Sequence, residues 1–167
     1  AMSLMAHPDD CEMLAGGTLA HLAARDWEIH LVTMTPGDGG SVELGPESIA
    51  AVRRQEGAAS AAVIGATYHC LESRDLYVMF DEDTIRRANS LMRAINPSLV
   101  LTHSLDCYMM DHEVTARISR SATFGFSVPN TSSGPVGEGA AVPHFYYADA
   151  VEGIDAYGRP VQPTTLV

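Results

Sequence analysis

The sequence predicts an α/β fold, a doubly wound, mostly parallel sheet of about five strands with helices on both faces. Two observations predict it. Short apolar runs alternate with longer segments of helical periodicity along the chain, with few interruptions. Turn residues such as glycine and proline separate these segments. Alternation of this kind is typical of parallel sheets, because helices must carry the chain back between parallel strands.

The first half of the chain contains three expected strands and two expected helices. Residues 2–6 form an apolar strand, and Leu14, Leu19 and Leu22 then recur near helical spacing over about residues 11–25. A second strand covers residues 28–34, before the glycine-rich turn at 36–40. A helix from about Glu47 ends at Gly65, which suits the position after a helix end. The third strand is expected at residues 67–71.

The second half continues the alternation. A helix over about residues 83–95 ends before Pro97, since the residue preceding proline disfavours helix. Strands at 98–102 and 144–148 flank a helix at 111–122. The Gly/Ser/Pro-rich stretch 128–143 is expected to be a mobile loop. Right-handed crossovers in the strand order 3-2-1-4-5 would place the first and fourth strands side by side, with the ligand crevice at their carboxyl ends.

Composition narrows the class of protein. A length of 167 residues suits one domain over 1–167, and no apolar run is long enough to span a bilayer. The net charge of −11 and the lack of a Lys/Arg cluster argue against nucleic acid as a partner. Three cysteines are too few for a disulfide framework, which favours a cytoplasmic location. The final extended residues lack a cap, so we expect a C-terminal segment to be missing or disordered.

Chemistry-bearing side chains follow both central strands. His7, Asp9 and Asp10 come after the first strand, and His103 and then His112 follow the fourth. Two imidazoles and one carboxylate, from His7, Asp10 and His112, would match a catalytic zinc site with one position left for water. The same donors also suit iron or cobalt.

Asp9 points differently from Asp10 in this interpretation and is free to act as the base on a water that the metal activates. The alternative is that Asp9 and Asp10 are helix caps, since the helix dipole favours carboxylates there. The two roles are compatible for Asp10. Cys11 and Cys107 lie close to these motifs; small buried apolar residues are the preferred interpretation, with thiolate ligation as the alternative.

Several motifs together resemble the LmbE/PIG-L family of zinc-dependent N-deacetylases. The matching segments, spread over residues 6–112 in the family's order, are Ala6-His7-Pro8-Asp9-Asp10-Cys11-Glu12, Gly16-Gly17-Thr18, Thr35-Pro36-Gly37-Asp38-Gly39, Arg53-Arg54-Gln55-Glu56, Asp75 and Asp111-His112. Residues 146–149 also resemble the family's last sheet strand.

The resemblance implies a Rossmann-like fold and zinc-dependent removal of an N-acyl group, commonly acetyl, from an N-acylated amino sugar or its conjugate. By position, His7, Asp10 and His112 would bind one zinc ion and Asp9 would be the general base. Arg53 would face the substrate; its alternative is a surface pairing with a nearby glutamate. Asp38 would line the pocket rim or orient His7, or serve only as a turn residue. Family members often assemble, so a homo-oligomer is also implied.

One position departs from the family pattern. Many members carry a histidine three residues before the ligand histidine, and this chain has Met109 there. A thioether cannot donate a proton or a hydrogen bond. His103 is the nearest substitute as a catalytic residue, with a purely structural strand-end role as the alternative. Asp111 is expected to hold His112 or His103 in the outer shell of the metal.

Three functions compete. The first is the deacetylase, with an amidase acting on a non-sugar small amide as its variant. The second is a nucleotide-binding module, which the sequence disfavours because no GxGxxG follows the first strand and two carboxylates there would repel a pyrophosphate. The third is a metal-binding relative whose deacetylase activity is weak or lost because of Met109.

Overall fold

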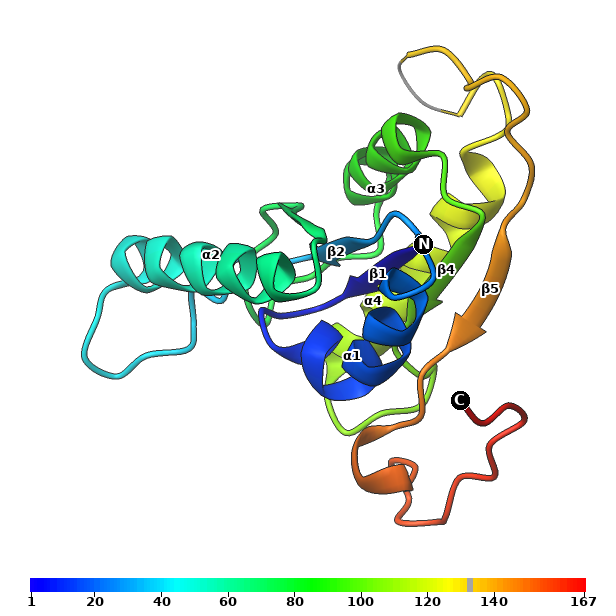
Figure 1. The fold of residues 1–167 in the computed structure, drawn as a ribbon. Coiled ribbons are helices and arrows are strands. Elements are labelled where there is room, and N and C mark those ends of the chain that lie inside the picture. Colours follow the sequence, from blue (N-terminus) through cyan, green and yellow to red (C-terminus); the bar gives the residue numbers. More distant parts are fainter. Residues whose placement is uncertain (132–133) are drawn as a thin grey trace.

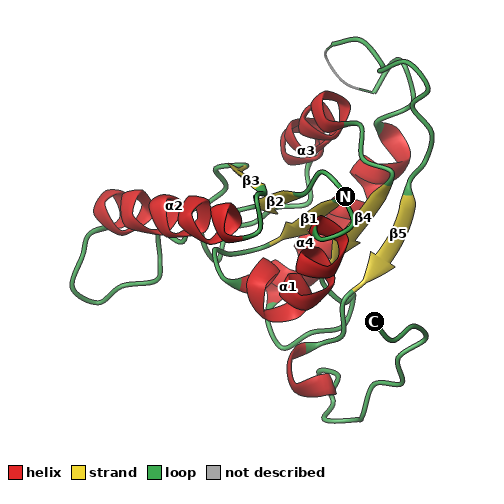
Figure 2. Cartoon of the chain, in the orientation of Figure 1, coloured by secondary structure: helices red, strands yellow, loops and turns green. Residues whose placement is uncertain are grey.

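The computed structural model describes residues 1–131 and 134–167 and shows a five-stranded parallel sheet covered by helices on both faces (Figures 1 and 2). The elements are β1 (Met2–Met5), α1 (Asp10–Ala23), β2 (His30–Thr33), α2 (Pro46–Val63), β3 (Thr67–Cys70), α3 (Glu82–Ile95), β4 (Leu99–Thr102), α4 (Met110–Gly125), β5 (His144–Tyr147) and the short 3-10 helix η1 (Val151–Gly153). The predicted fold class is confirmed.

The strand order is β3-β2-β1-β4-β5, and every pairing is parallel. β1 is therefore central, and its register places Leu4 opposite Thr102 on β4. The chain segments that leave β1 and β4 consequently emerge side by side, at the crevice that the sequence predicts.

Each face of the sheet buries its own apolar cluster, because successive strand residues point to opposite faces. Met2 and Leu4 of β1 belong to the larger cluster, which includes the fully buried Met92 of α3 and Phe126, directly after α4. Met5 packs in the second cluster, on the face that α1 covers. Full burial of each such side chain contributes about 1.5–3 kcal/mol. This packing makes the carboxyl end of β1 a rigid platform.

The expected elements all form, with shifted ends. α1 begins at Asp10, one residue earlier than expected, and Gly65 follows α2 with a positive φ of 69°, as a glycine after a helix end does. β2 is shorter than predicted. α4 continues three residues beyond its predicted end, because buried Phe126 directly after it packs into the larger cluster.

The loop expected at 128–143 includes residues 132 and 133, which lie outside the described residues. On its described flanks the buried Arg93 donates to the carbonyl oxygens of Val128 and Gly134, each at 2.7 Å. None of the helices within the described ranges is long and apolar enough to cross a membrane.

Candidate metal centre and active site

The loop after β1 holds an unusual backbone conformation. Asp9 occupies the N-cap position of α1 with φ at 128°, a region that residues with a side chain rarely adopt. Its side chain makes no capping hydrogen bond, so the cap alternative for Asp9 is not realised. Arg53 of α2 braces the loop instead, donating to the Pro8 carbonyl and lying 3.0 Å from Asp9 Oδ2. Strain maintained by such contacts is a frequent property of functional sites.

The three expected metal ligands converge. His7, Asp10 and His112 each offer a ligand atom, and these atoms all lie within 4.8 Å of one another. His7 Nδ1 lies 3.2 Å from Asp10 Oδ2, and His112 Nε2 lies 3.5 Å from Asp10 Oδ1. Ligands about 2.0–2.2 Å from a tetrahedral metal would stand roughly 3.3–3.6 Å apart. The donor set of two imidazole nitrogens and one carboxylate suits a divalent transition metal.

His7 is oriented by a carboxylate on the far side of its ring. Its Nε2 lies 3.2 Å from Oδ2 of the buried Asp111, which leaves Nδ1 turned toward Asp10. Burial lowers the pKa of His7, but hydrogen bonds with Asp10 and Asp111 outweigh it and raise the pKa above its ordinary value. The same Asp111 oxygen accepts from the backbone N–H of Leu76 at 2.7 Å. Asp111 thus contacts His7, whereas the sequence predicted His112 or His103 as its partner.

His112 is buried and surrounded on several sides. Its Nδ1 lies 3.2 Å from Cys107 Sγ, and its ring stacks on His103 at 4.0 Å between centroids with planes 9° apart. The Tyr108 ring meets it edge-on at 5.3 Å. Burial, then the neighbouring His103, lowers the pKa of His112 to about 4. The ring is therefore neutral at pH 7, as a metal ligand must be.

His103 is fully buried and stacks on His112. Its Nε2 lies 2.9 Å from the Ala6 backbone nitrogen and 3.2 Å from Asp10 Oδ2. Burial alone would raise the pKa of Asp10, but the imidazoles of His103 and His7 hold it well below its usual range. His103 is thus placed to position Asp10 and His112, while the pocket surface is formed by other side chains.

Asp9 faces the pocket beside Asp10, and its side chain is 55% exposed. Partial burial raises its pKa, the hydrogen bond from Arg53 opposes that shift, and the charge of Asp10 adds to it; the net pKa lies above the ordinary value. Arg53 lines the pocket and also lies 3.4 Å from Glu56, the surface pairing that was its alternative.

Asp38 and Asp75 join two loops at the rim. Asp38 Oδ1 accepts from the Asp75 backbone N–H at 2.8 Å, and Asp75 Oδ2 accepts from the Gly39 backbone N–H at 2.9 Å. Asp38 also lies 3.5 Å from Arg74, which turns it toward this loop contact. The carboxylate of this pair that lines the pocket is Asp75, whereas Asp38, which the sequence predicted at the rim, is not among the lining residues.

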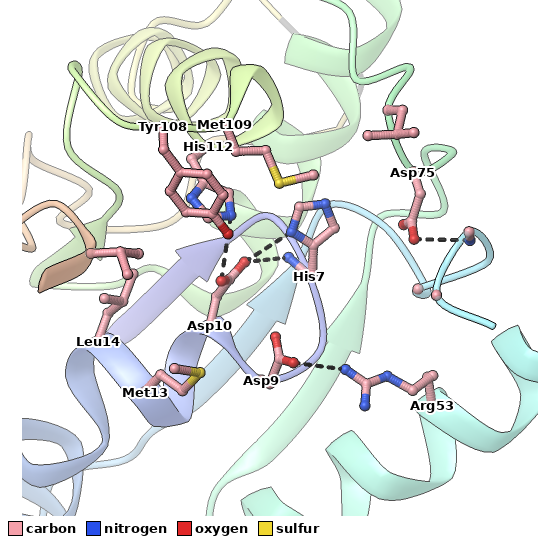
Figure 3. A pocket seen from close by; sticks show the side chains of 15 residues that line it. His7, Asp9, Asp10, Met13, Leu14, Arg53, Asp75, Tyr108, Met109 and His112 are labelled. Carbon is pink, nitrogen blue, oxygen red and sulfur yellow. Dashed lines mark hydrogen bonds and ion pairs between the residues drawn. The ribbon is translucent and has the colours of Figure 1, made fainter. Parts of the chain in front are cut away.

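These groups line one cavity of about 530 Å³ (Figure 3). Its apolar side chains come from α1, the loop after β3, the segment before α4 and η1. The lining residues are His7, Asp9, Asp10, Met13, Leu14, Gly37, Gly39, Gly40, Arg53, Asp75, Leu76, Tyr108, Met109, His112 and Val151. Met109, the departure from the family pattern, therefore lines the cavity.

Sequence reasoning missed Tyr108 as a neighbour of His112, and it placed Cys107 near the metal motifs without predicting its contact with His112. Both residues lie in the short segment between the end of β4 and His112. Their closeness to His112 in the sequence is the one feature that could have indicated these contacts. Their contacts with His112 depend on how this segment turns back over the end of the sheet, which periodicity does not reveal.

The model of the PIG-L family, GlcNAc-PI de-N-acetylase, matches residues 2–123. Among curated proteins, 4-oxalmesaconate hydratase of Pseudomonas putida is 29% identical over 130 residues, which cover 73% of this chain and 50% of that protein. The chain thus spans about half the length of this relative.

Two solved structures share the fold. The 4-carboxy-2-hydroxymuconate hydratase GalB of Pseudomonas putida superposes with a TM-score of 0.79 at 25% identity, covering 89% of this chain and 65% of the other. The N,N'-diacetylchitobiose deacetylase of Pyrococcus horikoshii superposes with a TM-score of 0.74 at 26% identity, covering 78% of this chain and 51% of the other. Because the family model matches most of its length, from β1 into α4, which carries His112, this chain belongs to the PIG-L (LmbE) family.

Proposed function

We propose that this protein is a zinc-dependent hydrolase that removes an N-acyl group, such as acetyl, from an amino-sugar-type small molecule in the cytoplasm. The observation that carries the proposal is the convergence of His7, Asp10 and His112 on one pocket that also contains Asp9. The similarity to a diacetylchitobiose deacetylase supports the choice of an amino sugar.

Zinc bound by these three ligands would polarise the acyl carbonyl and lower the pKa of a water molecule. Asp9 would take the proton from that water as its oxygen adds to the acyl carbon. When the carbon–nitrogen bond breaks, Asp9 would return the proton to the leaving nitrogen, yielding a carboxylic acid and a free amine. The raised pKa of Asp9 suits a group that must accept and then release a proton.

Arg53 would keep Asp9 in position for both transfers. Its guanidinium contacts Asp9 and the Pro8 carbonyl, so the loop is held from the α2 side, while Asp10 holds it from the metal side. The part of the Arg53 side chain that lines the cavity is also available to a polar group of the substrate.

A second candidate is hydration of a carbon–carbon double bond. Two observations favour it: Met109 places a thioether, which cannot protonate a leaving amine, on the pocket wall, and the relative that covers 73% of this chain is a hydratase. Hydration releases no amine. It needs only an activated water and a proton donor, roles that Asp9 could fill.

One set of assays separates these functions. Zinc-loaded protein is incubated with N-acetylglucosamine and N,N'-diacetylchitobiose, measuring free amine, and with 4-oxalmesaconate, measuring loss of the double bond. Asp9→Asn keeps the size of the side chain and an oxygen for Arg53 but cannot accept the proton, so turnover should fall about 10²–10⁴-fold with zinc still bound. Full activity of Asp9→Asn would overturn the role of Asp9, and the absence of both reactions would overturn both functions.

A further inference from the structure

The two histidines of the metal centre are held by unlike partners. Asp111 holds His7 through Nε2, whereas the side chain that faces Nδ1 of His112 is Cys107, with Sγ at 3.2 Å. Histidine ligands usually donate their free N–H to a carboxylate, a carbonyl oxygen or a water. A thiol sulfur is a weaker acceptor than any of these.

We propose that Cys107 is a positioning residue for the metal centre: its sulfur accepts the Nδ1–H of His112 and so fixes the ring with Nε2 toward Asp10. This inference rests on the zinc site of the proposed function. It concerns a residue that the sequence analysis treated as a small buried apolar side chain.

The contacts on the faces of the ring cannot supply this orientation. A stacking partner such as His103 touches the plane of the imidazole, and rotating the ring by 180° about its bond to Cβ leaves that plane in place. The same rotation would replace Nε2 by a carbon atom opposite Asp10. Only contacts at the edge of the ring distinguish the two orientations.

Cys107 provides such an edge contact. Once Nε2 gives its lone pair to a metal, Nδ1 must carry the ring proton. Among the interactions of the described residues, the sulfur of Cys107 is the acceptor placed at that nitrogen. Cys107 is 5% exposed, and its backbone N–H lies 3.4 Å from Glu113 Oε1 of α4, which ties the segment to the helix that carries His112.

Substitutions of Cys107 test the proposal by zinc affinity, measured in competition with a chromogenic chelator. Cys107→Val keeps the volume approximately but removes the acceptor, and we expect the zinc dissociation constant to rise about tenfold, the lower end for loss of an outer-shell partner. Cys107→Ser keeps an acceptor and should restore most of the affinity. Cys70→Ala, a partly buried cysteine on β3, is the matched control and should bind zinc as the wild type does.

A purely structural role would lower the melting temperature of the metal-free protein without this pattern of zinc affinity. NMR of the zinc-loaded wild type gives a readout that needs no variant: the Nδ1 proton of His112 should be present and protected from exchange. A His112 bound to zinc through Nδ1, or a Cys107→Val variant with wild-type zinc affinity, would overturn the inference.

The outcomes distinguish the inference from the proposed function. If the wild type binds zinc but converts no substrate, the proposed function is wrong and Cys107 keeps its role. If the wild type binds no zinc, the metal centre and the inference both fail.

Discussion

Asp111 links the candidate metal centre to the loop that carries Asp75, and replacing Asp111 should affect both. Its buried carboxylate, 3% exposed, contacts His7 Nε2 and the Leu76 backbone N–H. Leu76 has a φ of 66°, in the left-handed region that disfavours leucine, and its N–H would lose this acceptor in Asp111→Ala.

The expected magnitudes follow from these two contacts. Loss of the His7 contact should weaken zinc binding about tenfold to a hundredfold, or ~1.4–2.8 kcal/mol. Loss of the bond to Leu76 should destabilise the metal-free protein by about 1.5–3 kcal/mol, because the acceptor is charged and buried. Asp111→Asn separates the effects: its amide oxygen can still accept from Leu76, while the charge beside His7 is lost.

Zinc affinity by chelator competition and urea denaturation of the metal-free protein measure the two effects. Asp83→Ala is the matched control, since this aspartate is 84% exposed and pairs only with Arg87, at 3.3 Å, among its described ion pairs. Such a surface pair contributes about 0–1 kcal/mol, and zinc binding should not change. Wild-type zinc affinity in Asp111→Ala would refute the view that Asp111 orients His7.

Two further predictions concern stability. The pKa of His112 is about 4 in the metal-free fold and about 6.5 in an unfolded chain. As the pH falls, the unfolded state therefore binds this proton before the folded state does. The free energy of unfolding should decrease between about pH 6.5 and 4, by up to ~3 kcal/mol. His7, whose pKa is raised, changes the free energy of unfolding with pH in the opposite direction. Urea titrations of the wild type and of His112→Asn at several pH values isolate the effect of His112. Equal pH dependence in both proteins would contradict its assignment to His112. Gly57→Ala should lower the free energy of unfolding by about 1–3 kcal/mol, because a Cβ there would stand 2.7 Å from the Tyr68 ring. An unchanged urea midpoint would show that the ring moves aside at no cost.

Much of the fold follows from local pattern. The apolar run at β1, the periodic leucines of α1 and the glycine after α2 each reflect interactions within a few residues, and the parallel order follows from the handedness of crossovers. Element ends were less predictable, because they depend on tertiary contacts such as the burial of Phe126 after α4.

The candidate site, like the fold, has features that the sequence could predict and features that depend on tertiary contacts. The placement of His7, Asp10 and His112 in one pocket could be predicted, since parallel strands present their carboxyl ends at one edge. The partners of those side chains could not, because a shift of a few ångströms decides whether a carboxylate meets one imidazole or its neighbour. Asp111 contacts His7, and His103 lies behind His112.

The sequence by itself determined the family, the strand order and the identity of three candidate ligands, because these depend on residue type, spacing and the limited number of ways to wind a parallel sheet. The tertiary structure alone decided what surrounds the candidate ligands: a carboxylate beside His7, and a thiol and a stacked buried histidine beside His112. Those contacts are made between segments distant in sequence or inside irregular loops, where no periodic pattern records which side chains will meet.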